Sequence, residues 1–373
     1  MKKQRGKKKS AYKILGDRFP KDQVETWVVS DPLEEQERRY KVNVRLGKPI
    51  DILSLKSSMI DDFDSYVSGT ESTRTTLFKS GRLEKVDKCP VCGSSSEKSQ
   101  FRLNLYGGLY HQCNVCTHYF LINRPSKSEI EKFYSNSVTY ADTYTERRTA
   151  KIRVQQVAVP KVKWMIEQFK LFCGRGKPRS ILDVGAGGGH FVYACKQLGI
   201  NAKGIELSKI DREFCAKNFG IKLEALDFTT QYRTFSDVDV VTFWGVIEHT
   251  PNPVEMLKAA RRVLSGRNTL VVAEVPHWNC FSTALKMPYH IDSFAHINLF
   301  TRDSLVKAFE LSGFIPVAAW YFGMDAFSLV MYLSNFLKDV KVIDSLGKYI
   351  PIIQNIVDAC QFSDELVIAG KPK

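Results

Sequence analysis

A glycine-rich turn at 181–191 constrains the fold more than any other feature of the sequence. The segment ILDVGAGGGHF passes from an apolar run through Gly185, Gly187 and Gly189 into a helical pattern. Glycines let the N–H groups at a helix start approach a ligand closely. The spacing is not the GxGxxG of dinucleotide-binding proteins, because His190 stands at the last glycine position, and no GK[ST] follows for a P-loop. We therefore predict a strand, a ligand-binding turn and a helix in succession.

The rest of the chain after residue 180 alternates apolar runs with amphipathic stretches. We expect two of the helices to end at Gly199 and Gly220. The stretch 315–333 is interpreted as a strand followed by an apolar helix, because Asp325 would be costly in a bilayer. Further apolar helices precede the last strand, where core packing or a dimer face is favoured over a hydrophobic acceptor pocket. The expected strands are SILDV, AKGIEL, IKLEAL, DVDVVTFW, TLVVAEV and ELVIAG. This alternation predicts an α/β fold, a mostly parallel sheet with helices on both faces.

Asp183 precedes the glycines in the form DxGxGxG, which resembles the first motif of the class I S-adenosylmethionine (SAM) methyltransferases. The resemblance implies a seven-stranded Rossmann-like sheet with a helical insertion before the last strand. It also implies that Gly185, Gly187 and Gly189 pass under the amino-acid end and ribose of SAM, with Asp183 near its ammonium group. Glu206, at the end of the second strand, would accept both ribose hydroxyls, since a carboxylate has two acceptor oxygens.

The same resemblance assigns the remaining cofactor contacts. Asp227 falls where the family contacts the adenine amino group, and Phe228 is available to pack on the adenine ring. The fourth strand ends in FWGVIEHTPNP, where the family lines its methyl-transfer site, so Trp244 is expected beside the cofactor.

Three later segments are similar to a bacterial subgroup of these enzymes. They are the EH and NP pairs at 248–253, HINLFTRDSLVKAFELSGF at 296–314, and the terminal SDELVIAGKPK. Members of this subgroup carry an N-terminal zinc module, act often in sugar or cell-surface glycan biosynthesis, and include nucleotide-sugar C-methyltransferases. The resemblance covers 84–373 and implies a small-molecule or nucleotide-linked sugar as acceptor.

Two CxxC pairs separated by 20 residues predict a structural zinc site. Each pair offers two thiolates, and two pairs complete a tetrahedral ion with no position left for a catalytic water. His111 and His118 flank the second pair and are interpreted as surface or supporting residues rather than ligands. The predicted ligands are Cys89, Cys92, Cys113 and Cys116.

The acceptor must be aligned, shielded from water and relieved of a proton. His249 is the predicted general base, because imidazole titrates near neutrality and the residue follows the fourth strand at the carboxyl edge of the sheet. Glu248 would orient His249, accept a proton or contact a substrate hydroxyl. The alternative is that His249 only packs or caps the next helix. Val246 replaces the tyrosine of the C-methyltransferases, which leaves carbon or oxygen methylation open.

Further polar side chains follow the fifth strand, where related enzymes build substrate contacts. His296 is expected to fix the loop before a helix capped by Thr301 rather than to contact substrate. Weaker candidates for substrate contact are His277, His290, Tyr106, Tyr110 and Tyr289.

Charge and composition limit the remaining choices. The net charge is +14, and seven cations fall in the first 13 residues, a run interpreted mainly as a solvated tail and otherwise as a nucleic-acid or lipid clamp. RNA methylation is therefore a second hypothesis, although an NPPY-type motif is absent. A zinc-scaffolded binding protein without catalysis is a third. Paired cysteines, no signal sequence and no clear membrane span favour the cytoplasm.

The sequence divides into four expected parts. These are a basic tail with an uncharacterised segment (1–83), the zinc module (84–125), a helical linker interrupted at Pro160 (126–172) and the methyltransferase domain (173–373). Within the first part, WVV at 27–29 and YKVNVRL at 40–46 would pair as strands. Nothing in the sequence indicates the oligomeric state.

Overall fold

The computed structural model describes residues 21–31, 34–57, 60, 78–79, 82–126, 128–130, 147–287 and 296–373. The basic run at 1–13, most of the polar stretch at 57–77, Tyr289 and His290 lie outside these residues.

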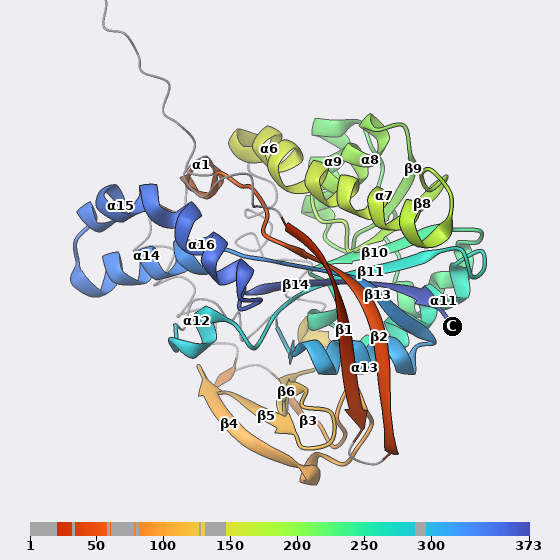
Figure 1. Cartoon of the computed structure of the whole chain (residues 1–373), viewed down its shortest axis with the longest axis horizontal. Helices are drawn as coiled ribbons and strands as arrows, with labels where there is room; N and C mark the ends of the chain where they lie inside the picture. The colour runs from red at the N-terminus through yellow and green to blue at the C-terminus, as the bar shows by residue number, and fades with distance from the viewer. Residues whose placement is uncertain are drawn as a thin grey trace, which may run out of the picture.

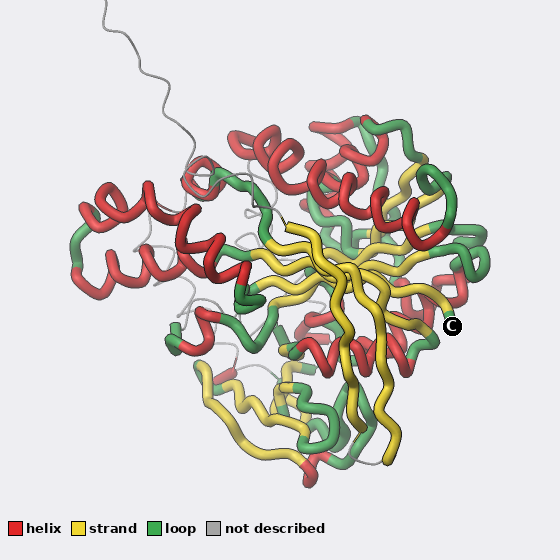
Figure 2. Tube along the Cα trace, viewed as in Figure 1, coloured by secondary structure: helices red, strands yellow, loops and turns green. Residues whose placement is uncertain are grey.

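The main sheet has eight strands in the order β1-β2-β13-β14-β11-β10-β8-β9 (Figures 1 and 2). β8, β9, β10 and β11 are parallel, whereas β14 runs antiparallel to both of its neighbours. The parallel strands therefore place their carboxyl ends at one edge, which is the edge where sites form in open α/β sheets. The strands after residue 180 are β8 (Ser180–Val184), β9 (Asn201–Ile205), β10 (Val240–Trp244), β11 (Leu270–Pro276), β13 (Phe314–Phe322) and β14 (Glu365–Pro372).

An N-terminal hairpin makes the sheet larger than the seven strands expected. β1 (Lys21–Asp31) and β2 (Glu34–Leu46) pair with Trp27 opposite Tyr40, as predicted. β2 then pairs in parallel with β13, which the sequence did not indicate. Val42 and Val44 are fully buried on alternate positions of β2, so the hairpin has one apolar face to add to the sheet.

The predicted strand at IKLEAL was wrong. The segment makes a single bridge, between Ile205 and Glu224, and otherwise runs as irregular chain beside β9. Leu223 is buried against Gly204, where an added Cβ would lie 2.6 Å from the leucine Cδ2. Side-chain burial and two backbone hydrogen bonds, one accepted and one donated by Glu224, therefore hold this segment without a strand, and its apolar residues gave a misleading signal.

Helices cover both faces of the sheet, as expected (Figure 1). α7 (Val159–Cys173) and α8 (His190–Gln197) pack with Val272 in one core cluster. α11 (Pro253–Val263) and α13 (Arg302–Leu311) pack with Val271 in the other. Adjacent strand residues thus point to opposite cores, the alternation that a sheet with two covered faces requires. α9 (Lys209–Phe219) ends at Gly220, which has a left-handed φ of 66°.

Pro160 was predicted to interrupt the helical segment, but the helix is continuous there. α6 (Arg147–Arg153) continues through a π-helical turn, η3 (Val154–Ala158), into α7. Pro160 stands in the first turn of α7, where its missing N–H is tolerated. The wider turn before it takes up the change in hydrogen bonding.

Three helices separate β13 from β14, at the place of the expected insertion. α14 (Asp325–Leu337), α15 (Lys341–Leu346) and α16 (Ile350–Ala359) share a small core with α1 (Ile52–Leu55) and extend to the left in Figure 1. Among the described residues, no helix has both the length and the apolar character that a membrane crossing requires.

The cysteine segment forms a small sheet of its own, in the order β12-β6-β5-β4. One edge strand of this small sheet, β12, comes from the segment after β11, so a piece of the large domain completes the module. A second pair, β3 (Leu83–Lys85) and β7 (Asn123–Pro125), closes the module. The strands of the larger sheet are β4 (Ser99–Leu105), β5 (Gly108–Cys113), β6 (Tyr119–Leu121) and β12 (Asn298–Leu299).

Candidate functional site

The glycine turn between β8 and α8 has a backbone that side chains would disturb. Gly185, Gly187 and Gly189 have φ values of 70°, 50° and 76°, in the left-handed region. A Cβ on Gly185 would lie 2.5 Å from Cγ2 of Val246, and one on Gly189 would lie 2.1 Å from Sγ of Cys215. The glycines are therefore needed both for conformation and for close packing.

Glu206 ties this turn to the end of β9. Its Oε2 accepts the Gly187 N–H at 2.8 Å, and its Oε1 accepts the Ser208 N–H at 2.7 Å. Burial raises the pKa of Glu206, against the effect of these backbone bonds. Each carboxylate oxygen has a second lone pair, so the group can accept two further donors from a ligand.

Asp183 lies at the end of β8 and is 2% exposed. Thr242, opposite it on β10, donates its hydroxyl to Oδ1 at 2.7 Å. Burial raises the pKa of Asp183 to about 7, more than the threonine bond lowers it. A cation placed beside this carboxyl would favour its ionised form.

Asp227 and Phe228 stand just past the same edge, because Glu224 bridges the last residue of β9. Asp227 caps the short helix α10 (Phe228–Gln231) and accepts the Thr229 N–H at 3.0 Å. Phe228 is 3% exposed, with its ring 6.0 Å from that of Phe243. The structure thus places the Phe228 ring in the core.

Trp244, at the end of β10, packs against a buried ion pair that could not be predicted from the sequence, between Lys161 and Glu274. The Lys161 ammonium lies 4.7 Å from the Trp244 ring centroid and 2.8 Å from Oε1 of Glu274. Lys161 and Glu274 are each 8% exposed. The one signal in the sequence is Glu274, an acid near the end of the apolar strand β11, since nothing local points from Lys161 to it.

Glu248 and His249 lie on a short 3₁₀ turn, η5 (Ile247–His249), directly after β10. Oε1 of Glu248 is 3.5 Å from Nε2 of His249. Glu248 is 1% exposed, and its Oε2 has no hydrogen-bond partner among the described residues. Burial raises the pKa of Glu248 well above its usual value, and the nearby Glu365 and Glu274 carboxyls raise it further.

His296 approaches this pair from the segment before β12. Its ring centroid is 5.0 Å from that of His249. One donor atom from each of Glu248, His249 and His296 lies within 4.8 Å of the others. This spacing suits an acid–base group that shares protons, and the same donors are close enough to ligate a cation.

The other predicted polar side chains lie elsewhere. His277 is 4% exposed, with Nδ1 3.2 Å from the Ser363 carbonyl, which is a core position. Tyr106 lies in the turn between β4 and β5, and Tyr110 is fully buried in β5. Thr301 caps α13 as predicted, in a capping box with Ser304.

The four module cysteines converge on one point. The Cys89 and Cys116 sulfurs are 3.6 Å apart, as are those of Cys92 and Cys113. Four thiolates about 2.3 Å from a tetrahedral zinc have sulfur–sulfur distances of about 3.8 Å, so the cluster fits zinc. The residue after each pair, Gly93 or Thr117, has a left-handed φ, and the two turns are built alike.

Comparison with known proteins gives one family match. Residues 162–319 match the family described as a methyltransferase domain. The chain carries a methyltransferase domain. The matched range begins in α7 and extends into β13, so it contains the glycine turn, Glu206 and the Glu248–His249 turn.

Solved structures give weaker likenesses to this methyltransferase. A SAM-dependent methyltransferase from Archaeoglobus fulgidus is 20% identical, with a TM-score of 0.40, and the match covers 57% of this chain and 94% of that one. Magnesium protoporphyrin IX methyltransferase from Synechocystis PCC 6803, with bound SAH, is 11% identical, with a TM-score of 0.44, and the match covers 66% and 100%. With such scores they carry no functional inference for this chain. No curated protein matches the sequence.

Proposed function

We propose that this methyltransferase transfers the methyl group of SAM to a sugar or glycan precursor at the carboxyl edge of the main sheet. The observation that carries the proposal is the glycine turn at 185–189 locked to Glu206 through the Gly187 N–H at 2.8 Å. This arrangement presents free lone pairs beside a close-packed backbone turn, which suits a ribose. A carboxylate at this place would repel a phosphate, so SAM fits better than a nucleotide diphosphate.

Bound SAM would supply an electrophilic methyl group on a sulfonium. Glu206 would accept the ribose hydroxyls, and Asp183 would lie near the cationic amino-acid end. Buried carboxyls suit a cationic ligand, because Lys161 alone does not bring the pKa values of Asp183 and Glu248 down to their usual range. The chain's own contribution is to bind and orient this cofactor.

His249 would take the proton from the acceptor as the methyl group is transferred. Its position follows β10 at the site edge, and the Glu248 oxygen 3.5 Å away can stabilise the imidazolium that forms. Oxygen and carbon acceptors both require this proton to leave, so the residues support either. The cysteine cluster would bind structural zinc, and because cysteines paired for a metal are typical of a reducing compartment we place the reaction in the cytoplasm.

Calorimetric titration with SAM and S-adenosylhomocysteine tests the cofactor assignment. Glu206→Ala should weaken both affinities at least about tenfold, since the ribose loses its acceptors. His249→Ala should bind SAM as the native enzyme does and lose turnover by about 10²-fold or more. An unchanged SAM affinity in Glu206→Ala contradicts the ribose assignment. Retained turnover in His249→Ala would show that His249 has only a packing role.

The acceptor class is tested with tritiated-methyl SAM and a panel of UDP-, GDP- and dTDP-linked hexoses. Label in a sugar nucleotide supports the proposal. Label in RNA, with binding that weakens steeply in salt and is lost on deletion of 1–13, would favour the RNA hypothesis instead.

A further inference from the structure

The cysteine module contacts the same turn that carries Glu248 and His249. We propose that the module builds the acceptor site by placing His296 opposite His249, so that His296 is a second imidazole that receives the acceptor's proton. The inference rests on the proposed methyl transfer and extends it to a residue expected only to fix a loop. It also gives the module a defined task in the reaction.

The backbone of His296 is held by the module. Tyr110, fully buried in β5, donates its hydroxyl to the His296 carbonyl at 2.6 Å. The next carbonyl, of Ile297, accepts the Leu121 N–H from β6 at 3.1 Å. Two module strands thus fix the segment just where its imidazole faces His249.

The turn at 248–251 is held by the module as well. Asn298, 1% exposed, donates from Nδ2 to the Thr250 carbonyl at 2.8 Å and to the Glu248 carbonyl at a longer 3.4 Å. Arg124 of β7 donates to the Pro251 carbonyl at 3.3 Å. Asn298 therefore connects the His296 segment to the Glu248–His249 turn.

His118 connects Asn298 to the metal site. Because the Asn298 amide nitrogen donates to two carbonyls, its Oδ1 faces His118, whose Nε2 lies 3.1 Å away and must carry the hydrogen. The His118 carbonyl accepts the Cys113 N–H at 2.8 Å, within the second CxxC turn. A continuous chain of hydrogen bonds thus joins the cysteine cluster to Asn298 and, through it, to the backbone on either side of His249.

The proton balance is simple. The bond between sulfur and methyl breaks as the bond between methyl and acceptor forms, and the sulfonium becomes a neutral thioether. The acceptor's proton goes to His249 and then to His296, which is only partly buried and can release it to water. Glu248, almost fully buried beside His249, stabilises the positive charge on the His249 imidazole during the transfer.

Histidine-selective NMR on the zinc-loaded full chain, with saturating S-adenosylhomocysteine, tests this without an acceptor. His296→Asn and His118→Leu should move the His249 imidazole signals and alter their pH titration. His118→Gln, which retains an N–H donor near the place of Nε2, should leave the His249 signals at their native positions. His111→Gln is the matched control, because His111 is a module histidine bonded to Ser99 and not to Asn298.

Activity on a labelled sugar nucleotide gives the second readout. His296→Asn should lower kcat by about 10²-fold and shift the pH profile, whereas SAM affinity and one zinc per chain are retained. If His118→Leu and His296→Asn leave the His249 signals as in His111→Gln, the inference is wrong. Failure of the native enzyme to methylate any sugar refutes the acceptor class instead, and the NMR result still decides the role of the module.

Discussion

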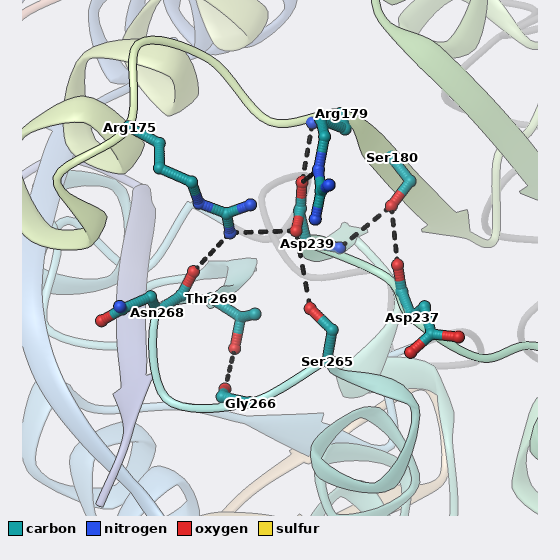
Figure 3. A network of polar contacts seen from close by, with 9 residues as sticks. All are labelled: Arg175, Arg179, Ser180, Asp237, Asp239, Ser265, Gly266, Asn268 and Thr269. Carbon is teal, nitrogen blue, oxygen red and sulfur yellow. Dashed lines mark hydrogen bonds and ion pairs between the residues drawn. The ribbon is translucent and has the colours of Figure 1, made fainter.

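Buried carboxyls at the two edges of the main sheet have opposite pKa shifts and different numbers of hydrogen-bond partners. At the amino edge, Asp239 is 1% exposed and fully engaged: Oδ2 accepts the Arg179 N–H at 2.7 Å and Oδ1 accepts from Arg175 at 2.9 Å (Figure 3). Burial alone would raise the pKa of Asp239, but these bonds outweigh it and the pKa is lowered. At the carboxyl edge, the pKa values of Asp183 and Glu248 are raised.

The difference separates a structural role from a functional one. Asp239 bridges α7, β8 and the loop before β11, since Arg175 also donates to the Asn268 carbonyl (Figure 3). Its partners are complete, so it stabilises the native state at neutral pH. Asp183 and Glu248 have spare acceptor capacity in a buried place, which is unfavourable for stability and typical of sites that await a ligand.

The largest effect is expected at the amino edge. Asp239→Ala removes the acceptor of the Arg179 backbone N–H and of the Arg175 guanidinium, two hydrogen bonds to a charged group worth about 1.5–3 kcal/mol each, so the free energy of unfolding should fall by about 3–5 kcal/mol. Urea unfolding measures this. Asp237→Asn is the control, because Asp237 contributes only its carbonyl to the network. Weaker SAM binding by the folded Asp239→Ala protein would contradict the division between the edges.

Gly185→Ala should have the next largest effect. A left-handed alanine costs about 1–2 kcal/mol and the clash with Val246 about 1–3 kcal/mol more. Gly220→Ala is the matched control, because its φ of 66° is similar but its Cβ would meet nothing within 4 Å. Equal losses in the two variants would show that the glycine turn at the site has no packing constraint of its own.

Asp183 should give the stability curve a characteristic slope. Its pKa is about 7 in the native state, compared with about 4 when unfolded. The native state thus holds a proton that the unfolded state has lost. The protonated Asp183 therefore contributes fully to the free energy of unfolding below about pH 4. The contribution is lost as the pH rises toward 7, by up to about 1.4 kcal/mol per pH unit.

Urea unfolding of Asp183→Asn between pH 5 and 7 measures that slope. The variant should lose less stability than the native protein as pH rises. The pH dependence from Asp239 has the opposite sign, since its pKa is lowered and its contribution to stability is lost only as the pH falls through the acidic range. If the free energy of unfolding changes with the same slope between pH 5 and 7 in the native protein and in Asp183→Asn, the raised pKa of Asp183 is contradicted.

Glu248→Gln should change stability least, within about 0.5 kcal/mol, because one oxygen of Glu248 has no hydrogen-bond partner among the described residues to lose. Turnover should nevertheless fall, since the imidazolium of His249 loses its carboxylate. Glu255→Gln, on the exposed side of α11, is the control for both readouts. A large loss of stability would place Glu248 with Asp239 as a structural acid.

Much of the site could be predicted because its signals are local. The glycine spacing at 185–189 and the two CxxC turns each act over a few residues, and the structure forms a close-packed glycine turn and brings the cysteine sulfurs together. Glu206 and Glu248 could be placed because parallel strands end at a common edge. Lys161 and Asn298 could not, since their partners lie 113 and 48 residues or more away and carry no matching local pattern.

The sequence by itself determined the alternation of most strands and helices after residue 180, the glycine turn and the cysteine cluster, because short-range periodicity and backbone conformation encode them. Only the tertiary structure decided that the hairpin at 21–46 joins β13, that IKLEAL makes one bridge to β9 instead of a strand, and that β12 completes the cysteine module and presents His296 to His249. These are pairings between distant segments. They depend on which apolar faces and backbone groups remain to be covered once the local elements have formed, and no local pattern contains that information.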